Sequence, residues 1–117
     1  MKTIKLPEKR ISIIFESNRI KYEKLTKQDI SNCDGFCYYN SINKIYVGVF
    51  NKKKSVLCHE LFHCIDFLNQ HLNEFDDSKF SESNAYLIGY LFQEFERELW
   101  EIIRKKKDFY IINIFYI

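Results

Sequence analysis

The sequence contains few of the residues that interrupt regular structure. Its 117 residues include only 3 glycines and 1 proline, and these two residue types mark most turns and linkers. No Pro-rich or Gly-rich linker and no internal repeat divides the chain, and this length is typical of one domain. We therefore expect a single domain over residues 1–117, dense in helices and strands.

The chain also lacks a strong excess of charge and a long apolar run. Its 18 Lys and Arg nearly balance its 16 Asp and Glu, giving a net charge of +2, which argues against a surface for nucleic acid or membrane. The longest apolar run, 109–117, is interrupted by Asn113 and is shorter than a membrane span of about 20 residues. Residues 1–10 lack the apolar core of a signal peptide. We expect a cytoplasmic protein with no nucleic-acid and no membrane partner and with reduced cysteines; its oligomeric state stays open.

Apolar and aromatic side chains, in contrast, are abundant. Hydrophobic residues make up 46% of the chain and aromatic residues 17%, which is enough to fill a core and argues against disorder. Apolar periodicity predicts strands and helices along the whole chain. The expected elements are a strand at 11–15, a short helix at 26–31, a hairpin of strands 36–40 and 44–50, a helix at 56–72, a loop at 73–79, and a helix from Ser81 to about Lys106. The last nine residues are expected to form an added strand or a packed tail. This order predicts an α+β fold.

The sequence His-Glu-Leu-Phe-His at residues 59–63 lies inside the expected helix 56–72. Residues four apart share one face of a helix, so His59 and His63 can both reach one Zn²⁺. Glu60, beside the first histidine, can take a proton from a water molecule that zinc makes acidic. This H-E-x-x-H arrangement is typical of metallopeptidases. The alternative, an ordinary pair of helical histidines beside an exposed glutamate, is disfavoured by the helical setting of the motif.

A catalytic zinc ion normally takes a third protein ligand, and Glu82 is the leading candidate. It lies at the start of the next expected helix, after a loop long enough to let that helix fold back. A second interpretation, that Glu82 only favours the dipole at a helix N-terminus, stays open. Three carboxylates in the loop are weaker alternatives: Glu74, Asp76 and Asp77.

Two further residues of the helix 56–72 are considered beside the motif. Asp66 could accept a hydrogen bond from the ring N–H of a ligand histidine, or it could be an ordinary polar residue on the helix flank. His71 is eight residues beyond His63, about two turns along the helix, and is too far to join the same metal.

The four cysteines form two pairs in the sequence. Cys58 and Cys64 flank the motif but lie off the histidine face, and we expect both to be buried small hydrophobes. Cys33 and Cys37 have a C-x-x-x-C spacing that could bind a second metal, although two ligands alone are a weak signal.

Together these residues resemble the gluzincin clan of zinc peptidases. His-Glu-Leu-Phe-His-Cys-Ile-Asp looks like the active-site helix of small phage-type metallopeptidases, and Glu82 begins a matching Glu-Ser-Asn-Ala-Tyr segment. The resemblance covers about residues 36–92. It implies a small zincin-like domain, with a short antiparallel or mixed sheet packed on the active-site helix and a second long helix carrying the glutamate ligand. It also implies hydrolysis of peptide bonds in a peptide or protein substrate that lies along an edge strand, expected to be 44–50.

The chain departs from this family at one position and leaves another unassigned. Many gluzincins have an aspartate one turn after the ligand glutamate, where this chain has Tyr86. Tyr86 and Tyr90 are candidate donors to the oxyanion of the reaction, but core packing is the expected role of both.

Two rival functions stand beside the zinc peptidase. One is a zinc-stabilised binding or regulatory module without turnover, such as an accessory protein of a mobile element. The other is a zinc site built from Cys33, Cys37 and one histidine. Glu60 favours the enzyme, because a structural site has four protein ligands and needs no general base.

Overall fold

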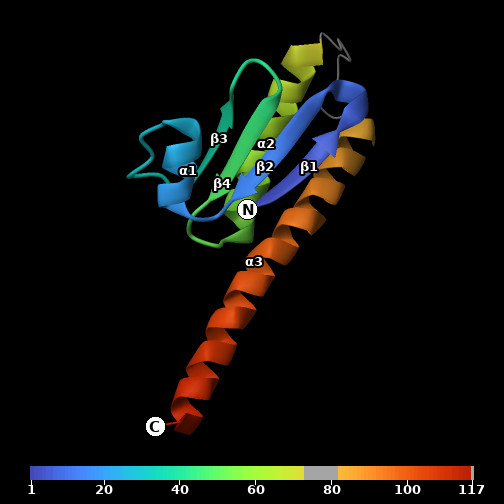
Figure 1. Cartoon of the computed structure of the whole chain (residues 1–117). Helices are drawn as coiled ribbons and strands as arrows, with labels where there is room; N and C mark the ends of the chain where they lie inside the picture. Colours follow the sequence, from blue (N-terminus) through green and yellow to red (C-terminus); the bar gives the residue numbers. More distant parts are fainter. Residues whose placement is uncertain (73–81, 117) are drawn as a thin grey trace.

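The computed structural model of the chain describes the backbone of residues 1–72 and 82–116 and the side chains of residues 1–70 and 82–100. Over these residues the protein is a small α+β domain with a four-stranded mixed sheet and three α-helices (Figure 1). The α+β prediction is therefore confirmed. The expected loop 73–79 and Ser81 lie outside the described residues.

The sheet has the strand order β1-β2-β4-β3. Strand β1 (Lys2–Leu6) pairs with β2 (Ile11–Glu16) in antiparallel fashion, and the 3₁₀ turn Pro7–Lys9 joins them. Strand β3 (Gly35–Tyr39) pairs with β4 (Lys44–Val49), also antiparallel, which confirms the predicted hairpin. Strand β1 was not predicted.

The expectation that 44–50 is an edge strand is wrong. Strand β4 pairs in parallel with β2 and antiparallel with β3, so it lies inside the sheet. The edge strand of the hairpin is β3, because the described strands give it β4 as its one neighbour. The parallel pairing joins strands far apart in sequence, and the local pattern of 44–50 holds no sign of it.

Helix α1 (Arg19–Thr26) lies against the sheet face opposite to the main core. The Asn18 side chain caps its N-terminus by accepting a hydrogen bond from the Lys21 N–H at 3.0 Å. The buried Tyr22 hydroxyl donates to the carbonyl oxygens of Phe36 at 3.2 Å and Tyr46 at 2.8 Å, which ties the helix to β3 and β4. The helix predicted at 26–31 is therefore wrong: Thr26 ends a helix that begins at Arg19.

Helices α2 (Lys54–Leu72) and α3 (Glu82–Tyr116) cover the other face of the sheet. They are antiparallel, since Lys54 pairs with Glu96 at 2.7 Å and the Asn84 amide nitrogen lies 3.5 Å from the Asn69 side-chain oxygen. The helix predicted at 56–72 is confirmed. The end of the second helix at Lys106 and the strand or packed tail after it are wrong, because α3 continues as helix to Tyr116. No glycine or proline follows Gly89 to end it.

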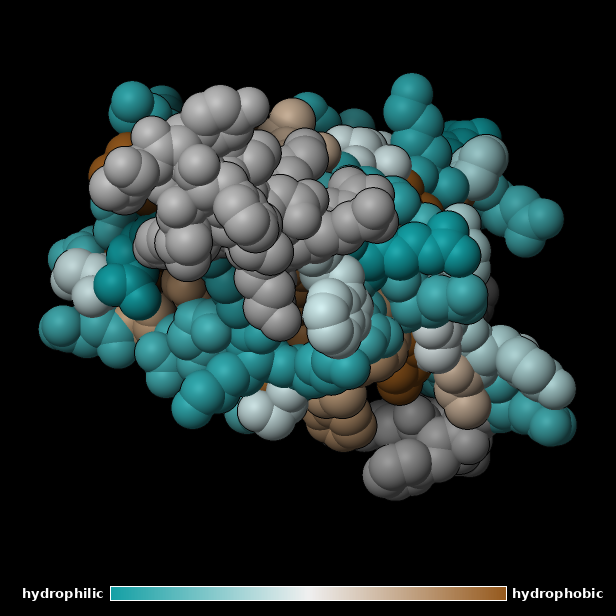
Figure 2. Space-filling view, turned by 90° about the horizontal axis from the view of Figure 1, so that it is seen from below, coloured by the Kyte–Doolittle hydropathy of each residue, from teal (hydrophilic) through white to brown (hydrophobic). Residues whose placement is uncertain are grey.

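The core fills the space between the sheet and these two helices. Phe15 of β2 stacks on Phe95 of α3, with ring centroids 4.9 Å apart. Both rings are almost fully buried. The other buried members come from the inward faces of three strands and both helices: Ile4, Ile11, Ile13, Ile45, Val47, Val49, Leu57, Leu61, Cys64, Ile65, Leu68, Leu91 and Leu99. The described surface in Figure 2 is mainly hydrophilic, with small separate apolar areas. No helix within the described residues combines the length and apolarity needed to cross a membrane.

Candidate metal centre

Helix α2 presents the two histidines of the motif at the surface of the protein. Leu57, Leu61 and Leu68 are buried at helical spacing, and they hold this stripe of α2 against the sheet. His59 and His63 take the opposite side of the same turns, and both are exposed. The amphipathic pattern that folds α2 onto the sheet therefore also sets the two imidazoles at the surface.

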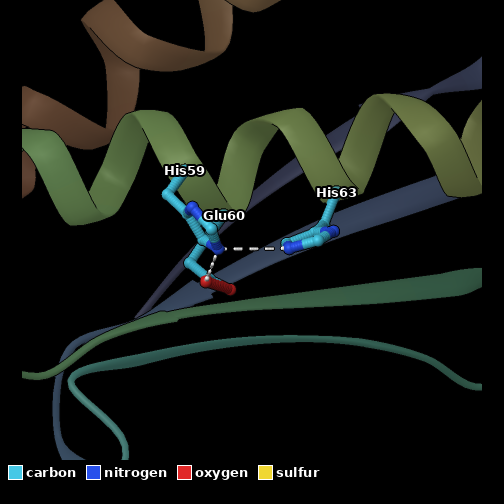
Figure 3. A group of neighbouring side chains, drawn as sticks. All are labelled: His59, Glu60 and His63. Atoms are coloured by element: carbon cyan, nitrogen blue, oxygen red, sulfur yellow. Dashed lines mark hydrogen bonds and ion pairs between the residues drawn. The ribbon is translucent and has the colours of Figure 1, made fainter.

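The two imidazoles face each other across one helical turn (Figure 3). Their Nε2 atoms are 3.2 Å apart, and the ring planes meet at 76°. Two nitrogens that each lie about 2.0–2.1 Å from a tetrahedral Zn²⁺ are about 3.3 Å apart. The separation of the two nitrogens is therefore compatible with binding of one zinc ion.

Glu60 completes a cluster of three ligand-type groups, all within 4.8 Å of one another. Its Oε1 atom lies 3.7 Å from His59 Nε2. The Glu60 side chain is buried, at 6% exposure, in contrast to the histidines. Burial raises the pKa of the Glu60 carboxyl, and the nearby His59 and His63 oppose this rise. A carboxylate with a raised pKa is a better proton acceptor near neutral pH, which suits a general base.

Glu60 is buried because α2 passes very close to strand β3 at Gly35. A Cβ built on Gly35 would lie 2.5 Å from Val56 Cγ1 and 3.0 Å from Glu60 Cγ. Only a residue without a side chain lets β3 approach the base this closely. Sequence reasoning missed Gly35; the available signal was a glycine at the start of a strand pattern, which often marks close backbone approach.

Glu82 lies outside the cluster. It is the exposed first residue of α3, which confirms its expected place at a helix start. The contact between Asn84 and Asn69 sets the start of α3 beside the C-terminal end of α2. Asn69 is six residues beyond His63, or about 9 Å along the axis of α2. Since Glu82 precedes Asn84, it begins α3 near this end of α2. Among the described side chains, no other His, Cys, Asp or Glu joins the three residues of the cluster. The ligand role of Glu82 stays a prediction.

Other candidates from the sequence take varied positions. Asp66 is half-buried on α2, one turn beyond His63, and its hydrogen bond to the ring N–H of a ligand histidine stays a prediction. The side chains of His71, Glu74, Asp76 and Asp77 lie outside the described residues. Core packing of Tyr86 and Tyr90 is wrong, since they are 74% and 50% exposed and line an open concavity on α3 with Glu82 and Gly89.

The four cysteines are free thiols. Cys64 is buried as expected, but Cys58 is exposed, because its position on α2 lies outside the buried stripe. Cys33 and Cys37 join no group of three ligands among the described residues. Burial raises the pKa of the Cys37 thiol well above its ordinary value, which disfavours the thiolate that zinc binds.

Comparison of the chain with family models, with curated proteins and with solved structures gave no match. The functional assignment therefore depends on the motif and on the geometry of His59, Glu60 and His63.

Proposed function

We propose that this protein is a zinc-dependent peptidase. The observation that carries the proposal is the pair of exposed imidazole Nε2 atoms 3.2 Å apart, with the buried Glu60 carboxylate 3.7 Å from one of them. The cluster supplies two of the three protein ligands that a catalytic zinc normally takes, together with a neighbouring base for the hydrolysis. A purely structural site uses four protein ligands and has no need for a buried carboxylate beside them.

Each residue of the cluster has a distinct task in this proposal. His59 and His63 hold the ion through Nε2. A zinc ion bound there supplies Lewis acidity, which lowers the pKa of water and polarises a carbonyl group. Glu60 accepts the proton of the attacking water and then passes it to the amine that leaves when the peptide bond breaks. Its burial between α2 and β3 holds the carboxylate in position for both transfers.

Strand β3 is the proposed binding edge for an extended peptide. It is the edge strand beside the cluster, and its Gly35 end lies against Glu60. Backbone groups along the free side of an edge strand can pair with a peptide as an added strand. A peptide bound in this way would pass in front of the base, which brings the scissile bond and the proton acceptor together.

Glu82 is the proposed third zinc ligand, on the strength of the sequence. Substituting it by glutamine should weaken zinc binding by at least about 10-fold to 100-fold, the size of effect known for residues that only hydrogen-bond to a metal ligand. Glu98→Gln on the same helix is the matched control. Zinc affinity that is equal in the two variants would remove Glu82 from the ligand set.

The test of the proposed function separates zinc binding from catalysis. The zinc-loaded protein, Glu60→Gln and the exposed control Glu8→Gln are assayed on an unstructured protein and on a quenched peptide library. Loss of a general base should lower the rate by about 10²–10⁴-fold, with zinc content unchanged. Equal rates in the wild type and Glu60→Gln contradict the assigned base. A zinc-loaded wild type that cleaves no peptide would instead support the binding module.

A further inference from the structure

The second half of α3 continues beyond the domain. Among the described side chains of α3, residues 82–100, the buried apolar ones are Leu91, Phe95 and Leu99. The helix then continues to Tyr116, and Figure 1 shows this part running past the end of the sheet, with the C-terminus far from the strands. The helix therefore rises about 25 Å from Leu99 to its end at Tyr116.

The sequence of this part changes abruptly from basic to apolar. Residues 104–107 are Arg-Lys-Lys-Lys, and residues 109–117 are Phe-Tyr-Ile-Ile-Asn-Ile-Phe-Tyr-Ile. Successive helix positions turn by about 100°, so four consecutive basic positions are distributed around the whole helix axis. The apolar positions from 109 onward are likewise distributed around the whole helix axis. A helix that is apolar all round belongs in an environment that encloses it.

We propose that the end of α3 inserts into the surface of a lipid bilayer that contains anionic lipids. The ring of basic positions at 104–107 is complementary to anionic headgroups, which attract Lys and Arg next to a membrane-inserted segment. Phe109 and Tyr110 stand at the end of the apolar segment next to the basic positions, and aromatic residues favour the boundary between headgroups and hydrocarbon. Residues 109–116 of α3 rise about 12 Å, which reaches deep into one leaflet of a hydrocarbon core about 30 Å thick.

A second copy of the chain is the less favoured occupant. Two helices that pair in water bury one apolar stripe each and keep polar residues on the outer side. Positions 109–117 have Asn113 as their one polar residue, so pairing of two helices would leave apolar positions in water. The inference is independent of the peptidase assignment. It departs from the expectation of no membrane partner, because a net charge of +2 for the chain conceals four consecutive basic residues.

The experiment uses the single tryptophan of the full chain. Trp100 is 52% exposed and lies one turn before the basic ring. Energy transfer from Trp100 to a dansyl lipid is measured on vesicles of phosphatidylcholine with about one third phosphatidylserine, and on vesicles of phosphatidylcholine alone. We expect binding to the anionic vesicles, because each basic residue near such a surface contributes about fivefold to binding.

Two pairs of matched variants test the two parts of the segment. Lys105→Gln/Lys106→Gln/Lys107→Gln should weaken binding on the order of 100-fold. The same changes at three exposed lysines in and next to α1, Lys21, Lys24 and Lys27, should have little effect. Ile111→Asp should abolish insertion, whereas Ile42→Asp, at a 72% exposed isoleucine of the β3–β4 hairpin, should leave it intact. Circular dichroism verifies that each variant is folded.

Three results would overturn the proposal. The first is no energy transfer from the wild type on anionic vesicles. The second is an equal loss of binding in the test and control variants. The third is a wild type that does not bind vesicles and forms a dimer in light scattering, which Ile111→Asp dissociates. The last result would assign the segment to a second copy of the chain.

Discussion

The contact between Gly35 and helix α2 gives a sharp test of how the fold positions the base. In Gly35→Ala the added Cβ would lie 2.5 Å from Val56 Cγ1, 3.0 Å from Glu60 Cγ and 3.0 Å from the Gly48 carbonyl oxygen. Carbon atoms in van der Waals contact are about 3.5–4.0 Å apart, so the methyl group is at least about 1 Å too close to Val56. Backbone strain is not involved, because no glycine of the chain has a positive φ.

The structure allows a magnitude for this change. Val56 cannot easily turn away, since a β-branched residue in a helix has one strongly preferred rotamer. The first turn of α2 must therefore move away from β3. Overpacking of this kind costs about 1–3 kcal/mol. A shift of about 1 Å in the position of Glu60 can also lower the rate of catalysis on the order of 100-fold.

The assay is urea unfolding followed by circular dichroism, together with peptide cleavage by the zinc-loaded protein. Gly89→Ala is the matched control, because a Cβ on Gly89 meets no atom within 4 Å and alanine favours a helix over glycine by about 1 kcal/mol. Gly35→Ala/Val56→Ala removes the closest atom and should recover part of the stability. A Gly35→Ala variant as stable and as active as the wild type would refute the reasoning.

Three further predictions follow from the core and the site. Phe95→Ala removes a fully buried ring stacked on Phe15 and should lower the free energy of unfolding by about 3–5 kcal/mol in urea titrations, whereas Trp100→Ala should change it far less. Burial raises the pKa of the Glu60 carboxyl above its ordinary 4.5. The metal-free native state therefore holds the carboxyl proton more tightly than the unfolded chain does. Its stability falls as the pH rises through the native pKa. Metal-free Glu60→Gln should therefore be more stable than the wild type at pH 7, and the difference should vanish in urea titrations below about pH 4. Removing zinc with a chelator should lower the melting temperature of the wild type, since zinc at 100 times its Kd adds about 2.7 kcal/mol; an equal drop in His59→Ala/His63→Ala in calorimetry would contradict this.

The parts of the fold that depend on local pattern could be predicted from the sequence. Helix 56–72 and the hairpin showed clear helical and alternating periods, and the structure has both. The opposed faces of His59 and Leu61 follow from the same helical period. The helix expected at 26–31 was misplaced: the helix of this region follows the Asn18 cap and ends at Thr26. Strand β1 was not predicted, although its alternation of Ile4, Lys5 and Leu6 is typical of a strand.

Features that depend on distant pairing could not be predicted. The parallel pairing of β2 with β4 moves the free edge from 44–50 to β3, and no residue of either strand encodes that choice locally. The close approach at Gly35 involves β3 and α2 together. The distance between Glu82 and the histidines depends on how α3 packs against α2, which its own sequence does not contain.

The central claim is that His59 and His63 bind one zinc ion, and that Glu60 acts as the base beside this ion without being one of its ligands. Titration of the metal-free protein with zinc in a calorimeter measures this directly, on the wild type, Glu60→Gln and His59→Ala/His63→Ala. The account predicts one site per chain in the first two proteins and none in the third. Full zinc stoichiometry in His59→Ala/His63→Ala would contradict it.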